Sequence, residues 1–243
     1  MADRFSEPEA TQRVVFEGLE YHESDRVGPA HYALEGSGPD GWVVLRNDVE
    51  HLRLGPGYRL LRTERCGVCS TDLARRFLPF PLPQIIGHEL IALDPEGQRY
   101  VVEINASHRA RGIPHACPFC ELGLANHCPE RRVLGIHDLP GGFGPWLLAP
   151  ERSAIALPDA ISSDVAVLVE PFAAALHAAE SIGLMPGDRV AVLGPRRLGL
   201  LVVAALVLCV RPLQVFLATR GSELSFRERS FIALSLIHIS APT

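Results

Sequence analysis

One short stretch of the chain holds side chains that suit a zinc ion. Cys69 precedes Asp72 by three positions, and His88 and Glu89 follow as a pair further along. Taken singly, such residues are explained by a buried thiol, a helix cap or a surface pair, but together they favour a metal site. A catalytic zinc takes three protein ligands and keeps one position open. Glu170, far along the chain, is a candidate for the third ligand, and Asp72 is suited to fix the tautomer of the His88 ring.

A second group of residues suits a structural zinc ion. Cys117 and Cys120 are separated by two residues, and Cys128 follows after seven more. A structural zinc is tetrahedral and needs four ligands, whereas this stretch offers three thiols. The histidines near enough in sequence to supply a fourth ligand are His108, His115 and His127. Without such a donor the thiols stay reduced and metal-free, so we expect weak metal binding or none here.

A glycine-containing turn predicts a nucleotide-binding site. Gly194 and Gly199 follow a short apolar run, as the first and last glycines of the G-x-G-x-x-G dinucleotide fingerprint do. Arg196 stands where the middle glycine is expected, so its side chain crowds an approaching pyrophosphate unless the guanidinium itself binds it. NAD binding needs an acidic residue about 20 positions further on, for the ribose. Thr219 and Arg220 stand there instead, which favours NADP over NAD.

Composition narrows the classes of function. The chain has 243 residues, a net charge of −5 and 47% hydrophobic residues, which predicts one large or two ordinary folded domains. All 23 basic residues are arginines, which excludes lysine Schiff-base chemistry and a lysine-dependent phosphate loop. These arginines form no basic stripe, which argues against a nucleic-acid partner.

The sequence also predicts a cytoplasmic protein without a membrane partner. The polar N-terminus has no signal-peptide core, and the apolar run 198–210 is too short to span a bilayer. The six cysteines of such a chain suit metal ligands or free thiols better than disulfides.

Two sequence patterns predict the strands and helices that position these residues. Short apolar runs separated by Gly and Pro predict an irregular antiparallel β domain. These runs cover residues 41–45, 58–61, 100–104 and 146–148. Further along, a capped apolar helix over 162–182 precedes a strand, turn, helix and strand, which is the opening of a parallel α/β unit. Its strands are expected at 189–193 and 213–218, and its helix at 200–210.

Five motifs occur in the order found in one enzyme family. They are GVCSTD from Gly67, GHE from Gly87, NHC from Asn126, VLGI from Val133 and VEP from Val169. Across residues 58–220 the chain resembles the zinc-dependent medium-chain alcohol dehydrogenases. It looks most similar to the sorbitol and threonine dehydrogenase branch, in which a glutamate replaces a cysteine as a zinc ligand.

The resemblance implies an α+β fold with two domains. A GroES-like irregular β-barrel, the zinc-binding catalytic domain, is expected over residues 41–158. The start of a Rossmann nucleotide-binding domain, with the helix that leads into it, is expected over residues 159–230. Residues 1–40 remain unassigned, and residues 231–243 continue no family pattern, so we expect a chain that is truncated relative to the family.

The resemblance also assigns roles to particular residues. Cys69, His88 and Glu170 match the catalytic zinc ligands, and Glu89 lies beside them as an alternate ligand. Thr71 resembles the hydroxyl that passes a proton from the substrate alcohol. The family has four structural-zinc cysteines, of which three are matched and the first falls at Pro114. The matched positions are Cys117, Cys120 and Cys128.

The implied activity is hydride transfer between a primary or secondary alcohol, or a polyol, and NAD or NADP. The implied partners are zinc, the nicotinamide cofactor and a small-molecule alcohol or carbonyl, with a homo-oligomer expected for the intact protein. Residues 188–243 provide 56 positions, whereas a nucleotide-binding domain needs on the order of 100–150, so we expect weak cofactor binding by this chain.

Two alternatives remain at this point. In a non-catalytic zinc module, the pair Cys66 and Cys69 would join Cys117 and Cys120 as a four-thiolate site. The 47 residues between those pairs exceed the roughly 15–20 that are usual in zinc ribbons. In the other alternative, the chain is a folded remnant without activity.

Overall fold

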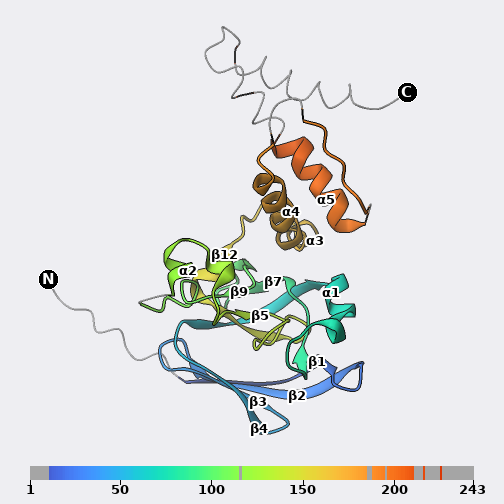
Figure 1. Ribbon diagram of the computed structural model, residues 1–243. Coiled ribbons are helices and arrows are strands. Elements are labelled where there is room, and N and C mark those ends of the chain that lie inside the picture. The colour runs from blue at the N-terminus through green and yellow to red at the C-terminus, as the bar shows by residue number, and fades with distance from the viewer. Residues whose placement is uncertain are drawn as a thin grey trace, which may run out of the picture. The chain divides into compact units, whose positions relative to one another are not determined.

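The computed structural model describes residues 11–114, 117–184, 188–194, 196–210, 216 and 225. The chain divides into two compact units, residues 1–170 and residues 171–243. The strands of the described part lie in the first unit, and the second unit contains helices and coil (Figure 1).

Antiparallel strands build the first unit. One five-stranded sheet has the order β4-β3-β2-β1-β6, and a second has the order β11-β5-β7-β8-β12. The strands of the first sheet are β1 (Gln12–His22), β2 (Arg26–Ser37), β3 (Gly41–Arg46), β4 (Val49–Leu54) and β6 (Gln84–Ile85). Those of the second are β5 (Tyr58–Gly67), β7 (Glu89–Leu93), β8 (Arg99–Val102), β11 (Trp146–Pro150) and β12 (Ala154–Ala156). A small ladder pairs β9 (Asn105–Ala106) with β10 (Arg132–Val133).

A long hairpin accounts for most of the N-terminal region that the sequence left unassigned. Strands β1 and β2 pair in register from Gln12 opposite Gly36 to His22 opposite Arg26. The sheet continues through a two-residue turn at Asn47 and Asp48, both of which have positive φ. Asn and Asp tolerate this backbone better than other non-glycine residues, which suits a tight hairpin between β3 and β4. The hairpin thus belongs to the same sheet as the strand predicted at 41–45.

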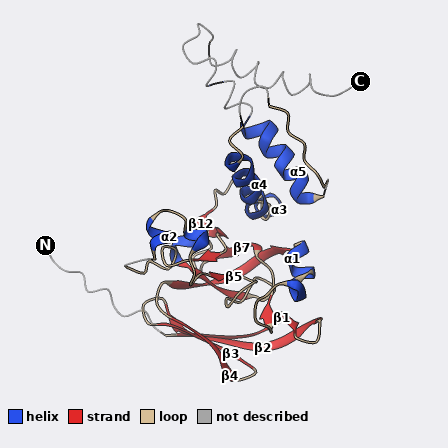
Figure 2. Ribbon diagram, in the orientation of Figure 1, coloured by secondary structure: helices blue, strands red, loops and turns tan. Residues whose placement is uncertain are grey.

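The apolar core combines side chains from both five-stranded sheets. Trp42 of the first sheet and Leu61, Leu90 and Leu147 of the second are at most 2% exposed. These layers lie one above the other in Figure 2. The indole N–H of Trp42 donates to the Tyr58 carbonyl at 3.0 Å, so its one polar group is satisfied. Burial of each large side chain contributes about 1.5–3 kcal/mol, which makes this core the main source of stability.

The helices are short in the first unit and longer beyond it. They are α1 (Ser70–Leu73), α2 (Pro118–Glu121), α3 (Ser163–Ala166), α4 (Val169–Ser181) and α5 (Arg197–Ala205). Three 3₁₀ turns are η1 (Arg75–Phe77), η2 (Ala125–His127) and η3 (Glu151–Ser153), and a π-helical turn, η4 (Leu206–Val210), follows α5. The helix predicted at 162–182 is therefore present as α3 and α4, and the one predicted at 200–210 as α5 and η4. Among the described residues, no helix is long and apolar enough to cross a membrane.

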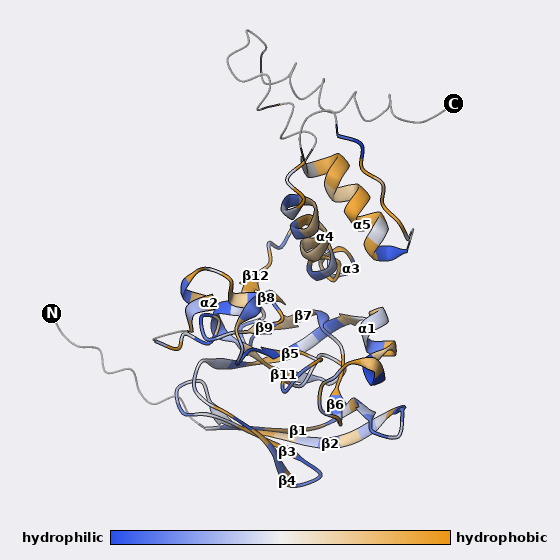
Figure 3. Cartoon of the chain, in the orientation of Figure 1, coloured by the Kyte–Doolittle hydropathy of each residue, from blue (hydrophilic) through white to orange (hydrophobic). Residues whose placement is uncertain are grey.

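The predicted strand at 189–193 is wrong, because these residues are coil in the structure. A buried strand exists only through pairing with neighbours, and no sheet is present in the described part of the second unit. Of the partner strand predicted at 213–218, only Phe216 is described, and it is helical. Helix α5 contains one charged residue, Arg197, and is otherwise apolar or glycine, and the side visible in Figure 3 is largely hydrophobic. Such a helix is typically covered on more than one side.

Candidate metal centres

Three potential metal ligands converge beside the end of the β5–β7 pair. One ligand atom each from Cys69, His88 and Glu89 lies within 4.8 Å of the others. Pairing of β5 with β7 places Gly67 opposite Glu89, so the segments that follow β5 and precede β7 are brought together. The side chains of His88 and Glu89 are buried, and Cys69 is half-buried. Thiolate, imidazole and carboxylate donors of this kind fit a zinc ion.

Asp72 fastens the two ligand-bearing segments to each other. Its buried carboxylate accepts the backbone N–H of Cys69 at 2.8 Å and the backbone N–H of Gly87 at 3.0 Å. The first of these bonds caps α1, which begins directly after Cys69. Asp72 therefore fixes the spacing between the thiol of residue 69 and the imidazole of residue 88.

The ring of His88 is buried beside negative groups. Its Nδ1 lies 3.4 Å from Asp72 Oδ1, close enough for charge attraction but without the geometry of a hydrogen bond. Burial lowers the pKa of His88, but Asp72 and Cys69 outweigh burial and raise it to about 9. The site thus favours a positive charge at this position, which a proton or a metal ion can supply.

Gly87 allows the backbone turn that presents His88. Its φ is +93°, a conformation that side chains disfavour. A Cβ here would lie 2.6 Å from the Phe143 ring and 2.8 Å from Cys66 Sγ, which is too close for real contacts. The glycine of the GHE motif is therefore required by both backbone conformation and space.

Thr71 lies at the edge of this cluster. The thiol of Cys69 donates toward Thr71 Oγ1 at 3.6 Å, and the threonine is half-buried. Glu170, the third ligand expected from the sequence, is the second residue of α4. Among the described residues the cluster holds Glu89 rather than Glu170, so the role of Glu170 stays a prediction.

A second cluster contains the three thiols predicted for a structural site, together with His108. One ligand atom each from His108, Cys117, Cys120 and Cys128 lies within 4.8 Å of the others. Cys117 caps α2, Cys120 lies within it, and Cys128 follows η2. Burial raises the pKa of Cys120, but backbone N–H groups and the neighbouring thiols outweigh this effect and lower it. Burial and the same neighbouring thiols raise the pKa of Cys128, so the metal-free cluster favours its thiolate at Cys120.

The sequence left three histidines open, and the structure describes two of them, His108 and His127. His108 is buried within the thiol cluster, whereas His127 is exposed and faces the Phe119 ring. His115 lies outside the described residues. The expectation that no fourth donor is near is therefore revised, because the His108 ring supplies a fourth potential ligand atom and Pro114 supplies none. Whether the cluster binds metal stays a prediction.

The four-thiolate alternative does not match this arrangement. Cys69 and Cys117 belong to separate clusters, and Cys66 belongs to neither among the described residues. Burial raises the pKa of the Cys66 thiol well above its ordinary value, which disfavours a thiolate ligand at that position.

The glycine turn of the second unit is partly described. Gly194 has a φ of +94°, and a Cβ at Gly199 would meet the Gly194 carbonyl oxygen at 2.1 Å. Gly199 thus permits the first turn of α5 to lie close to the Gly194 carbonyl. In the fingerprint the last glycine lets the helix pack on a strand, whereas residues 188–194 are coil here. Arg196 is the exposed N-cap of α5. Thr219 and Arg220 lie outside the described residues.

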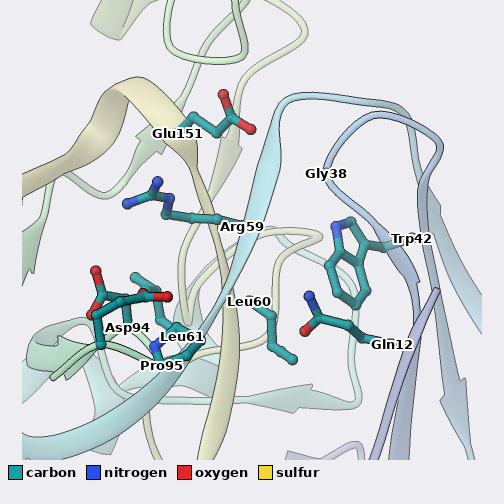
Figure 4. Close-up of a pocket in the computed structure, with 10 residues that line it drawn as sticks. Gln12, Gly38, Trp42, Arg59, Leu60, Leu61, Asp94, Pro95 and Glu151 are labelled. Carbon is teal, nitrogen blue, oxygen red and sulfur yellow. The ribbon is translucent and has the colours of Figure 1, made fainter. Parts of the chain in front are cut away.

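A cavity of about 280 Å³ lies elsewhere in the first unit (Figure 4). Its lining includes Trp42, Arg59, Asp94 and Glu151, and none of the clustered thiols or histidines. The candidate chemistry is therefore located at the two clusters and not at this cavity.

Comparison with known proteins identifies the family of the first unit. Residues 55–159 match the family model of the alcohol dehydrogenase GroES-like domain. L-threonine 3-dehydrogenase of Deinococcus deserti is 32% identical over 175 residues, which cover 67% of this chain and 49% of that protein. The chain spans about half the length of the curated relatives it matches.

Two solved structures extend the similarity to the fold. A chain from Sinorhizobium meliloti 1021, determined with bound NADP, is 26% identical with a TM-score of 0.58, and the match covers 78% of this chain and 52% of that one. L-idonate 5-dehydrogenase of Escherichia coli is 20% identical with a TM-score of 0.63, and the match covers 82% and 56%. The match to the alcohol dehydrogenase GroES-like domain and the similarity to L-threonine 3-dehydrogenase place the chain in the zinc-dependent medium-chain alcohol dehydrogenase family.

Proposed function

We propose that the chain supplies the zinc-binding catalytic domain of an oxidoreductase. The reaction is hydride transfer between a primary or secondary alcohol, or a polyol, and NAD(P). The observation that carries this proposal is the convergence of Cys69, His88 and Glu89, of which His88 and Glu89 are buried, with the Thr71 hydroxyl beside Cys69.

Each residue of the site has a proposed role. Cys69 and His88 would hold a zinc ion, with Glu170 as the proposed third protein ligand and Glu89 as the alternate one. When bound, zinc acts as a Lewis acid that lowers the pKa of a coordinated alcohol. Asp72 keeps the two ligand segments in place through its two backbone hydrogen bonds.

Thr71 is proposed to move the proton. Its hydroxyl can accept the substrate proton and release its own toward solvent, because a hydroxyl both donates and accepts. A bound nicotinamide would supply the redox chemistry by accepting the hydride that the carbinol carbon gives up.

The cofactor is proposed to lie on the turn before α5. Gly194 and Gly199 provide the close packing that a dinucleotide site uses, and Arg220 together with Thr219 favours the 2′-phosphate of NADP. Small molecules are the proposed partners, without nucleic acid or membrane. The free thiols suit a reducing, cytoplasmic compartment.

Cobalt substitution tests this function without requiring turnover. The cobalt-loaded chain is titrated with a secondary alcohol and with the matching ketone while its visible spectrum is recorded. We expect a saturable shift of the cobalt bands, because the first site keeps an open position. The variant Cys69→Ala, which retains the second cluster, is expected to show no shift.

Turnover is then measured with NAD and NADP by absorbance of the reduced cofactor. We expect Thr71→Val to lower the rate and Thr71→Ser, which keeps the hydroxyl, to restore it. The proposal would be contradicted if no alcohol or ketone shifted the cobalt bands of the parent chain.

A further inference from the structure

The cluster at His108 is compact, and one of its ligand–ligand distances matches the edge of a tetrahedral zinc site. His108 Nδ1 lies 3.6 Å from Cys128 Sγ. With Zn–S and Zn–N bonds of about 2.3 and 2.05 Å, the edge between sulfur and nitrogen of a zinc tetrahedron is about 3.6 Å. The two side chains are therefore already separated by the distance that a shared zinc ion requires.

The protonation pattern around His108 leaves the correct nitrogen available. The backbone N–H of Cys117 donates to Nδ1 at 3.3 Å, so Nδ1 carries a lone pair. The other nitrogen, Nε2, lies 3.0 Å from Glu130 Oε2 and donates to it. A carboxylate on the outer nitrogen is the usual partner of a metal-binding histidine, because it fixes the tautomer and raises the basicity of the ligand.

We propose that His108, Cys117, Cys120 and Cys128 form a closed zinc centre with one nitrogen and three sulfur ligands. Glu130 is the residue that positions His108. The chain thereby replaces the cysteine expected at Pro114 with a histidine six residues earlier.

All four positions of this centre are protein ligands, so it binds no substrate and stabilises structure. Residues 107–131 contain only α2 and η2 as helical elements among their described positions. Ligands at 108, 117, 120 and 128 tie both ends and the middle of this segment together.

The test uses the full chain carrying Cys69→Ala, so that metal at the first cluster does not contribute. Cobalt is added to the purified protein and its affinity and visible spectrum are measured in competition with a chelator. We expect one equivalent to bind, with charge-transfer intensity for three thiolates. His108→Ala is expected to lose binding at least 100-fold, whereas His127→Ala is expected to keep the parent affinity and spectrum.

A variant that restores cobalt binding distinguishes loss of a ligand from general damage to the fold. Coordination through Nδ1 places the metal about as far from Cβ as a cysteine thiolate does, because Nδ1 is bonded directly to Cγ. His108→Cys is therefore expected to restore binding and to add the charge-transfer intensity of a fourth thiolate.

The positioning role of Glu130 has its own comparison. Glu130→Gln is expected to weaken cobalt binding about 10- to 100-fold without changing the number of thiolate bands. Glu121→Gln, an exposed carboxylate on α2, is the matched control and should leave affinity unchanged. The proposal is overturned if the parent binds no cobalt, or if His108→Ala binds it with the parent affinity and spectrum.

Discussion

Asp72 offers the sharpest test of how the first cluster is held together. Asn at this position has nearly the same volume but provides one carbonyl oxygen and an NH₂ group. One of the two backbone N–H groups, at Cys69 or Gly87, then faces a donor in place of an acceptor. A hydrogen bond to a charged group contributes about 1.5–3 kcal/mol, and an unsatisfied buried donor costs a similar amount. We therefore expect Asp72→Asn to lower the free energy of unfolding by about 2–3 kcal/mol.

The same substitution should weaken metal binding. Because outer partners of metal ligands typically contribute 10- to 100-fold in affinity, zinc affinity at the Cys69 cluster is expected to fall within roughly that range. Urea unfolding of the metal-free chain gives the stability, and chelator competition gives the affinity. Asp159→Asn is the control, since Asp159 is exposed and only its backbone carbonyl is used. If Asp72→Asn matched this control in both measurements, the account of Asp72 would be refuted.

Three further predictions address other parts of the chain. Gly87→Ala should destabilise the protein by about 1–3 kcal/mol more than Gly97→Ala, because both residues have positive φ but only Gly87 is crowded by neighbouring side chains. Equal losses in the free energy of unfolding, measured with urea, would contradict this prediction. Burial opposes ionisation of Glu20, but hydrogen bonds from Arg46 and Tyr32 outweigh burial and lower the pKa of this carboxyl below the ordinary 4.5. The contribution of ionised Glu20 to the free energy of unfolding is therefore complete above about pH 4.5 and is lost as the pH falls further. Glu20→Gln should therefore cost about 3–5 kcal/mol near neutral pH, with a smaller difference in acid, whereas a pH-independent difference would count against the pairing. Arg196→Gly should tighten NADP binding in calorimetric titration, since it removes the side chain at the expected pyrophosphate position, and an unchanged Kd would argue against that steric role.

The sequence predicted that Cys69 and His88 lie close together, but it did not predict all of the elements around them. Cys69 and His88 were identifiable because thiolate and imidazole occur in motifs whose order is characteristic. The β1–β2 hairpin was not identifiable from the sequence, because its pattern of buried and exposed residues does not follow hydrophobicity. Leu19 is 46% exposed while Glu20 beside it is fully buried with Arg46 as its partner.

The second cluster shows where spacing alone stops being informative. Three histidines are close enough in sequence to complete the site, and only the fold shows that His108 reaches the thiols. Glu130 carries no sequence signal, since an exposed acidic residue after a cysteine is common. The strand predicted at 189–193 is wrong for a similar reason, because pairing with residues distant in sequence decides whether an apolar run becomes a strand.

Anomalous diffraction at the zinc absorption edge tests the central claim most directly. Crystals of the zinc-loaded chain are expected to show one peak bonded to Cys69 Sγ and a ring nitrogen of His88, with a carboxylate from Glu170 or Glu89 as the third protein ligand. A zinc-loaded crystal with no peak between Cys69 and His88 would contradict the assignment of this cluster as the catalytic metal site.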